Sequence, residues 1–218
     1  MKTWIAALCT SMTLLAGAAQ ASANPVVYQQ APSGSPNAYA SQFDTGANGD
    51  FSKVYDDFSL AADTTITDIH WLGQYFSGSR TNGVDSFLIQ FWSAGSAAPG
   101  SLLYSATVTN ANETLVSGDT YSYDVDLASA FLVQANTTYW VSIQAKMLFP
   151  PQWGWSEGTG GNGVATQDFF GVRSSLPFDL AFSLTGTPTG SLPEPMSLLL
   201  VGLALTGAGL ARRAKSQR

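Results

Sequence analysis

The sequence predicts an all-β protein: an antiparallel β-sandwich of jelly-roll-like order, with a signal helix before it and a transmembrane helix after it. Three observations predict the sandwich. Apolar and polar residues alternate with a period of two in many short segments. Thr, Tyr, Phe and Trp are frequent, whereas the helix-favouring residues Glu, Lys and Met are few. Clusters of Gly, Pro, Asn and Ser separate the alternating segments.

Residues 1–23 have the three parts of a secretory signal peptide. Lys2 supplies the positive start, residues 5–18 form an apolar stretch, and Ala21-Ser22-Ala23 provides the small residues of a cleavage site. The segment is therefore excluded from the folded domain. It carries Cys9, the only cysteine of the chain, so we expect neither a disulfide nor a thiolate metal site in the mature protein.

Residues 24–49 form a Pro-, Ser- and Gly-rich lead with room for one strand, and residues 50–187 form the predicted sandwich. The alternation is clearest in residues 120–127, where Tyr121, Tyr123 and Val125 face one way and Asp124 and Asp126 the other. About nine strands are expected, at residues 54–60, 65–76, 85–93, 102–109, 120–127, 131–134, 138–146, 164–170 and 178–184. A polar linker follows at residues 188–192.

Residues 193–218 form a tail of three parts. Pro193-Glu194-Pro195 is followed by an uncharged apolar run at residues 196–211 and by four cations, Arg212, Arg213, Lys215 and Arg218. As a helix the apolar run spans about 24 Å, against about 30 Å for the hydrocarbon core of a bilayer. The cations favour a cytoplasmic end, which places the sandwich on the outer side of the inner membrane.

This tail resembles the PEP-CTERM sorting signal of Gram-negative bacteria that make exopolysaccharide. The resemblance implies that an exosortase, a membrane protease, acts at Pro193-Glu194-Pro195, and a permanent tail anchor is the alternative. Three segments, Val54-Tyr-Asp-Asp-Phe, Thr138-Tyr-Trp-Val-Ser-Ile and Asp179-Leu-Ala-Phe-Ser-Leu, are similar to an ectodomain common among PEP-CTERM proteins. That resemblance implies a β-sandwich module of undetermined activity.

Charge and residue types limit the classes of function that are possible. The mature domain has four cations against twelve aspartates and two glutamates, so nucleic acid is excluded as a partner. His70 is the only histidine and lies in the middle of a predicted strand, which favours a structural role. Asp124 and Asp126 lie about 6.7 Å apart along one strand face, a spacing compatible with glycoside hydrolysis, although solubilising acids explain them as well.

The aromatic residues and the acids provide the remaining candidate sites. We expect Trp153 and Trp155, in a predicted loop, together with Trp92 and Trp140, on the polar side of their strands, to contact a glycan; packing inside the sandwich is the alternative. We expect no cofactor other than a structural calcium ion. Its candidate ligands are Asp56, Asp57 and Asp179, and solvated acids are the alternative.

Together these features predict a non-enzymatic, secreted protein of the cell surface or the exopolysaccharide matrix. It would cross the inner membrane, stay anchored there transiently by its C-terminal helix, and then be processed by the exosortase. The alternative is a carbohydrate-binding module or, less favoured, a glycoside hydrolase, either of them acting on extracellular polysaccharide.

Overall fold

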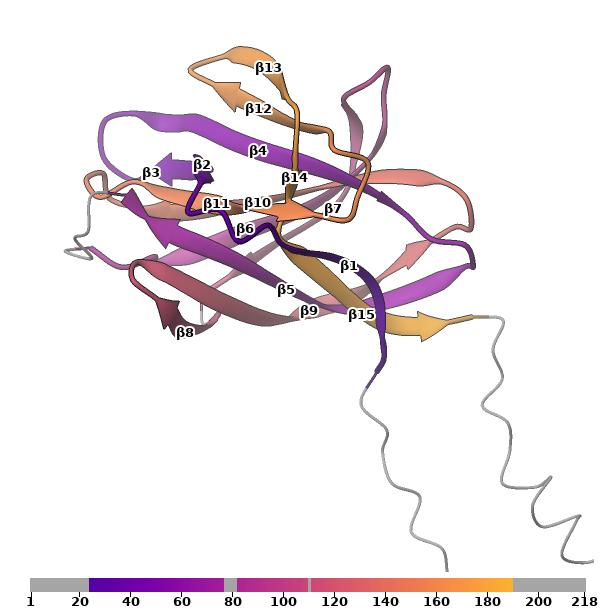
Figure 1. Ribbon diagram of the computed structural model, residues 1–218. Helices are drawn as coiled ribbons and strands as arrows, with labels where there is room; N and C mark the ends of the chain where they lie inside the picture. The colour runs from indigo at the N-terminus through magenta and orange to yellow at the C-terminus, as the bar shows by residue number, and fades with distance from the viewer. Residues whose placement is uncertain (1–23, 77–81, 110, 190–218) are drawn as a thin grey trace, which may run out of the picture.

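The computed structural model describes residues 24–76, 82–109 and 111–189, and these residues form two β-sheets stacked on one core (Figure 1). The predicted signal peptide and the sorting motif with its basic tail lie outside the described residues. Within the described residues, no helix is long and apolar enough to span a bilayer. The predicted all-β fold with antiparallel sheets is confirmed.

One sheet has eight strands. Along it the order is β14-β11-β1-β15-β5-β9-β8, with β2 paired to β11 and a further pairing of β11 with β5. All of its pairings are antiparallel. Its strands are β1 (Val26–Pro32), β2 (Ala38–Ala40), β5 (Thr64–Tyr75), β8 (Asn112–Ser117), β9 (Thr120–Val133), β11 (Trp153–Thr159), β14 (Asp179–Leu180) and β15 (Phe182–Pro188).

The other sheet has seven strands in the order β13-β12-β4-β3-β10-β6-β7. The short β3 lies between the diverging ends of β4 and β10, and its pairing with β10 is the one parallel pairing among the described strands. The strands are β3 (Gln42–Asp44), β4 (Gly49–Ser59), β6 (Ser86–Ala94), β7 (Pro99–Val108), β10 (Thr138–Met147), β12 (Ala165–Phe169) and β13 (Val172–Leu176).

The core lies between the sheets and is built from the inward positions of each alternating strand. Tyr123 and Val125 of β9 are buried, while Asp124 and Asp126 between and after them are exposed, as predicted. Aromatic rings dominate the contact between the sheets: Phe91 of β6 stacks on Phe131 of β9 with ring centroids 4.6 Å apart. Burial of such rings is the main favourable contribution to folding here.

The predicted strand positions agree with most of the long strands, but β8, β11 and β13 were not predicted, and the ends of the described chain also differ. The stretches predicted at residues 120–127 and 131–134 are one continuous strand, β9, and the stretch at residues 178–184 is interrupted at Ala181, between β14 and β15. Residues 24–49 contribute β1, β2 and β3 rather than a single strand, so the sandwich begins at Val26. At the other end β15 continues through Pro188, into the predicted linker.

The turn between β3 and β4 is organised by one carboxylate. Asp44 Oδ1 accepts hydrogen bonds from the backbone N–H groups of Gly46 (2.9 Å) and Phe149 (3.0 Å). Its Oδ2 accepts from the backbone N–H and the side-chain amide of Asn48, each at 2.8 Å. Asp44 therefore holds its own turn and also ties that turn to the segment after β10.

Candidate functional site

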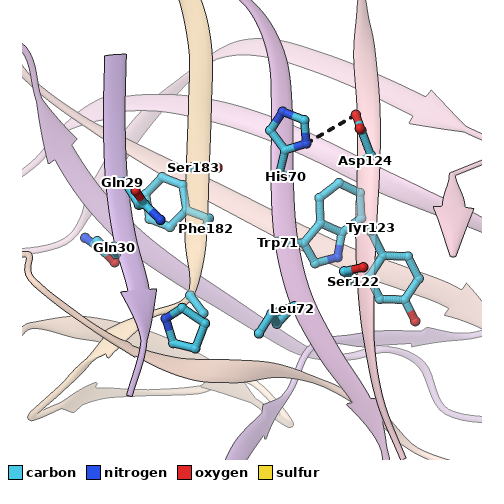
Figure 2. A pocket seen from close by; sticks show the side chains of 12 residues that line it. Gln29, Gln30, His70, Trp71, Leu72, Ser122, Tyr123, Asp124, Phe182 and Ser183 are labelled. Carbon is cyan, nitrogen blue, oxygen red and sulfur yellow. Dashed lines mark ion pairs between the residues drawn. The ribbon is translucent and has the colours of Figure 1, made fainter. Parts of the chain in front are cut away.

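A hollow of about 290 Å³ lies on the outer face of the eight-stranded sheet, over β1, β15, β5 and β9 (Figure 2). The hollow lies where β1 changes partner. β1 pairs with β15 up to Gln30 and with β11 from Ala31 onward. The residues that line it are Gln29, Gln30, Pro32, His70, Trp71, Leu72, Ser122, Tyr123, Asp124, Ala181, Phe182 and Ser183.

Strand register brings the polar side chains of the hollow into one row. Gln29 of β1 is paired with Ser183 of β15, Ser183 with His70 of β5, and His70 with Asp124 of β9. Residues opposite each other on neighbouring strands point to the same face of a sheet, so the four side chains stand side by side on the solvent side. The row extends to Asn112 at the edge of the sheet.

Small side chains create the depression beside this row. The next outward positions are Ala181, Leu72 and Ser122, where Leu72 N donates to Ala181 O (3.3 Å) and Leu72 is paired with Ser122. Alanine and serine fill little of the space above the sheet, so Leu72, which is half-buried, forms an apolar floor between them. The resulting surface has an apolar base and a polar wall.

Two side chains of the polar wall, those of His70 and Asp124, are in contact with each other. His70 Nδ1 lies 3.2 Å from Asp124 Oδ1, the contact drawn as a dashed line in Figure 2. The side chains of His70 and Asp124 are 34% and 57% exposed, so both can reach a ligand while they hold each other in place. The pair presents an imidazole and a carboxylate to the same small volume as Gln29 and Ser183.

The surface next to the hollow is acidic. Asp68 of β5 is paired with Asp126 of β9, and the hydrogen bond between their carboxyl groups raises the pKa of Asp126. Burial raises the pKa of Asp68, but the hydrogen bonds it accepts from Asp126, Thr67 and Thr185 outweigh this and lower it. This neighbourhood disfavours an anionic ligand in the hollow and is compatible with a neutral or cationic one.

Comparison with known proteins identifies the family. The family model described as a domain of unknown function (DUF7901) matches residues 26–173, which is more than half of the chain. The chain belongs to the DUF7901 family. The matched segment includes Gln29, His70, Leu72 and Asp124 of the hollow, whereas Ser183 lies beyond it. No curated protein and no solved structure matches the chain.

Two of the four tryptophans predicted to contact a glycan are core residues of the DUF7901 fold. Trp153 and Trp155 lie on strand β11 rather than in a loop, and both are fully buried. Trp153 Nε1 donates to Tyr123 OH (3.0 Å), and Trp155 Nε1 donates to Ala181 O (3.0 Å). The two indoles are two residues apart on one strand, so both point inward, and neither is available to a ligand.

The other two tryptophans are on the outer face of the seven-stranded sheet, as their alternation predicts. Trp92 of β6 and Trp140 of β10 are directly paired, and neither belongs to the central core. Trp140 is only 4% exposed, so its ring is not an open platform. Trp92 is half-buried, donates from Nε1 to Ser142 Oγ (3.2 Å) and packs edge-on against Tyr55.

Asp179 interacts electrostatically with Asp56 and Asp57, the other two predicted calcium ligands, although it is more than a hundred residues from them in sequence. Leu180 N donates to Asp56 Oδ2 (2.5 Å), which places β14 against β4. Asp57 instead accepts the amide of Asn162 on both oxygens. Among the described residues, no group of three or more His, Cys, Asp or Glu side chains is arranged as a metal site. A calcium ion at this place stays a prediction.

The hollow was not predicted from sequence. Gln29 lies in the Pro-, Ser- and Gly-rich lead, which has room for one strand, and the place of His70 in the middle of a predicted strand favours a structural role. Ser122 and Ser183 occupy ordinary outward positions of alternating strands. Only the pairing of β1, β15, β5 and β9 puts Gln29, Ser183, His70 and Asp124 in one row with Ser122 beside it. Strand pairing over 150 residues has no local signal in one sequence.

Proposed function

We propose that this DUF7901 protein is a non-enzymatic, secreted β-sandwich that binds a neutral polysaccharide at the cell surface or in the exopolysaccharide matrix. The proposal depends on one observation: the row of Gln29, Ser183, His70 and Asp124 beside the apolar floor of the hollow. The net negative charge of the domain and the Asp68–Asp126 pair favour an uncharged ligand over an acidic one.

The chemistry of the hollow suits a sugar ring. A sugar presents hydroxyl groups that donate and accept hydrogen bonds, and a ring face made of C–H groups. Gln29, Ser122 and Ser183 can each donate and accept, the Asp124 carboxylate accepts, and Leu72 offers an apolar surface to the ring. The volume of about 290 Å³ is at the lower limit for ligand pockets, so one sugar residue at a time is expected.

A site of this size binds weakly on its own. Affinity for a single sugar is expected in the millimolar range, because few groups contact the ligand and its ordering costs free energy. Many copies of the protein on one surface, facing a repeating polymer, would raise the effective affinity by about 10²–10⁴ without any new contact. Display in an envelope or a matrix is therefore consistent with a shallow site.

We propose binding rather than catalysis at this site. A serine nucleophile needs a base within hydrogen-bond reach. Among the hydrogen bonds of the described residues, none joins Ser183 to His70, although the two are neighbours across the strands. The hydrolase alternative with Asp124 and Asp126 predicts release of reducing ends from a polysaccharide, which either the Asp124→Asn or the Asp126→Asn substitution would abolish.

Targeting is part of the same proposal. We propose four features from the sequence alone: the signal peptide, a PEP-CTERM-like tail, the jelly-roll-like strand order and the two terminal helices. One feature of the fold supports such an arrangement: Val26 is paired with Thr185, so both ends of the described chain leave the sandwich side by side (Figure 1). A C-terminal membrane helix would then hold the sandwich by one end and leave both sheet faces accessible.

The saccharide site is tested with the full-length chain on an array of neutral and acidic oligosaccharides. We expect binding to at least one neutral glycan, and we expect Gln29→Ala and His70→Ala each to weaken it about fivefold or more, since each removes a hydrogen bond worth about 1 kcal/mol. The control is Trp92→Ala, on the opposite sheet, which should bind as the wild type does. Equal binding by all four proteins would exclude the hollow.

Sorting is tested by mass spectrometry of the mature protein from its own host. We expect an N-terminus near Asn24 and a C-terminus near Pro193, and we expect Pro193→Ala combined with Glu194→Ala to leave the tail attached. An intact C-terminus in the wild type would show that the tail is not cleaved, and the permanent anchor would then be the better explanation. Intact protein with both ends retained in the cytosol would contradict secretion altogether.

A further inference from the structure

Behind the hollow lies a buried acidic cluster formed by Asp56, Asp179, Gln30 and Tyr28. Asp56 of β4 is fully buried and Asp179 of β14 is 4% exposed. The glycine-rich segment after β11 closes over Asp179: Gly161 N donates to Oδ2 (2.9 Å) and Gly163 N to Oδ1 (2.6 Å). The cluster therefore joins β4, β14, β1 and the loop before β12.

The two aspartates of this cluster have no basic partner in the described part of the chain, and burial raises the pKa of Asp56 well above its usual value. Each lysine or arginine described there is engaged elsewhere: Lys53 with Asp50, Arg173 with Asp168, and Lys146 over the ring of Phe43. Burial, followed by the charges of the nearby acids, raises the pKa of Tyr28 to about 12. Buried carboxylates normally require a cation or a proton to offset the cost of leaving water.

A neutral oxygen in the cluster is also without a partner. Gln30 is 1% exposed, and its Nε2 donates to Tyr28 OH (2.9 Å) and to Asp57 O (3.2 Å). Its Oε1 is buried and accepts no hydrogen bond. A Cβ atom on Gly161 would lie 2.4 Å from Gln30 Nε2 and 2.7 Å from Asp179 Oδ1, so the amide nitrogen of Gln30 and the Asp179 carboxylate are within about 5 Å of each other.

We propose that this cluster binds one calcium ion, with the carboxylates of Asp56 and Asp179 and the amide oxygen of Gln30 as ligands. Calcium takes six to eight oxygen ligands, among them carboxylates and side-chain amide oxygens. Two carboxylates match the charge of the ion. Every oxygen of Asp56 and Asp179 already accepts one N–H group, from Asp57, Leu180, Gly161 or Gly163, and each keeps a second lone pair for a metal.

This ligand set differs from the one that the sequence predicts. Asp57 is held by Asn162, and its backbone oxygen receives the Gln30 amide, so it supports the site from outside. Gln30 replaces it as a ligand. Because only two of the three ligands are acids, the site is compatible with the finding that no three acidic or histidine side chains converge among the described residues.

Equilibrium dialysis of the EDTA-treated full-length chain against calcium chloride tests the proposal. We expect one calcium ion per chain, with a Kd of about 10⁻⁴–10⁻³ M as in other extracellular modules. Saturating calcium should raise the Tm by about 5–10 °C. We expect Gln30→Leu to raise the Kd about tenfold, and Asp179→Asn to abolish binding.

Controls separate this site from other acids. Asp126→Asn disrupts the exposed Asp68–Asp126 pair and should leave both calcium affinity and the calcium-induced rise in Tm unchanged. If Asp179→Asn does not fold, the calcium affinity of Gln30→Leu alone decides whether the proposal holds, because that substitution removes no charge. Absence of binding up to about 10 mM calcium, an order of magnitude above the weakest expected Kd, overturns the proposal, as does binding that Gln30→Leu leaves intact. No saccharide is used, so the result is independent of the proposed function.

Discussion

Replacing Trp153 by alanine is expected to lower the free energy of unfolding by about 3–5 kcal/mol, the range for a large aromatic residue removed from a core. The indole is completely buried and lies directly against Gly73, where a Cβ atom would be only 2.1 Å from Trp153 Cζ2. Its ring also packs against Phe87 at a centroid distance of 5.1 Å. Because a close-packed core relaxes only partially around such a truncation, we expect a cavity where the indole was.

The substitution also breaks a polar contact inside the sandwich. Tyr123 OH would lose the hydrogen bond from the indole Nε1, which is 3.0 Å away, while Tyr123 remains buried. Guanidinium unfolding of the wild type, Trp153→Phe and Trp153→Ala measures the effect. Trp153→Phe should be intermediate, because it keeps most of the ring volume and loses only the N–H donor.

Trp92→Ala is the matched control for Trp153→Ala. Trp92 is half-buried on an outer face, so its loss should cost about 1–2 kcal/mol, clearly less than the loss of Trp153. If Trp153→Ala were as stable as the wild type and had lost glycan binding, the indole would have to be a ligand contact rather than a core residue. Equal destabilisation by Trp92→Ala and Trp153→Ala would show that the outer face carries as much packing energy as the core.

The regular part of the fold is predictable because strand alternation is a local property. In β6 and β10 every second side chain is apolar, and β5 and β9 follow the same alternation on either side of a register shift; these apolar positions form the core as predicted. The Trp153-Gly-Trp155 segment follows the same rule, but its proline- and glycine-rich neighbours concealed a strand of seven residues. Alternation over three residues between such neighbours is too short to separate a strand from a loop.

Short strands and sites depend on partners that are distant in sequence, and for this reason they were predicted less well. β3 has three residues and exists because β4 and β10 diverge around it. The hollow depends on the register of β1 against β15 near the two ends of the chain. A calcium ion at Asp56, Asp57 and Asp179 was predicted from their acidic side chains and stays a prediction. Gln30 is a neutral residue, and its burial has no signal in the sequence.

Asp44→Asn is expected to lower the free energy of unfolding by about 1.5–3 kcal/mol at pH 7, the range for hydrogen bonds to a charged acceptor. The carboxylate accepts four hydrogen bonds from Gly46, Asn48 and Phe149, and an amide has one acceptor oxygen where the carboxylate has two. Urea unfolding of the wild type and of Asp44→Asn measures the difference. Asp85→Asn, at an exposed position, is the control and should change stability by less than about 0.5 kcal/mol.

The pH dependence of this difference identifies the charge as its cause. The hydrogen bond from Phe149 N, followed by those from Asn48 and Gly46, lowers the pKa of Asp44 to about 2. A carboxyl group with a lowered folded-state pKa stabilises the fold fully above its unfolded pKa of about 4 and loses that contribution as the pH falls through about 2. The stability gap between the wild type and Asp44→Asn should therefore be constant from pH 7 to about 5 and close towards pH 2. If the stability difference between the wild type and Asp44→Asn stayed constant down to pH 2, the charge of Asp44 would not be its cause. Protonated Asp44 would then hold the turn as well as the carboxylate does.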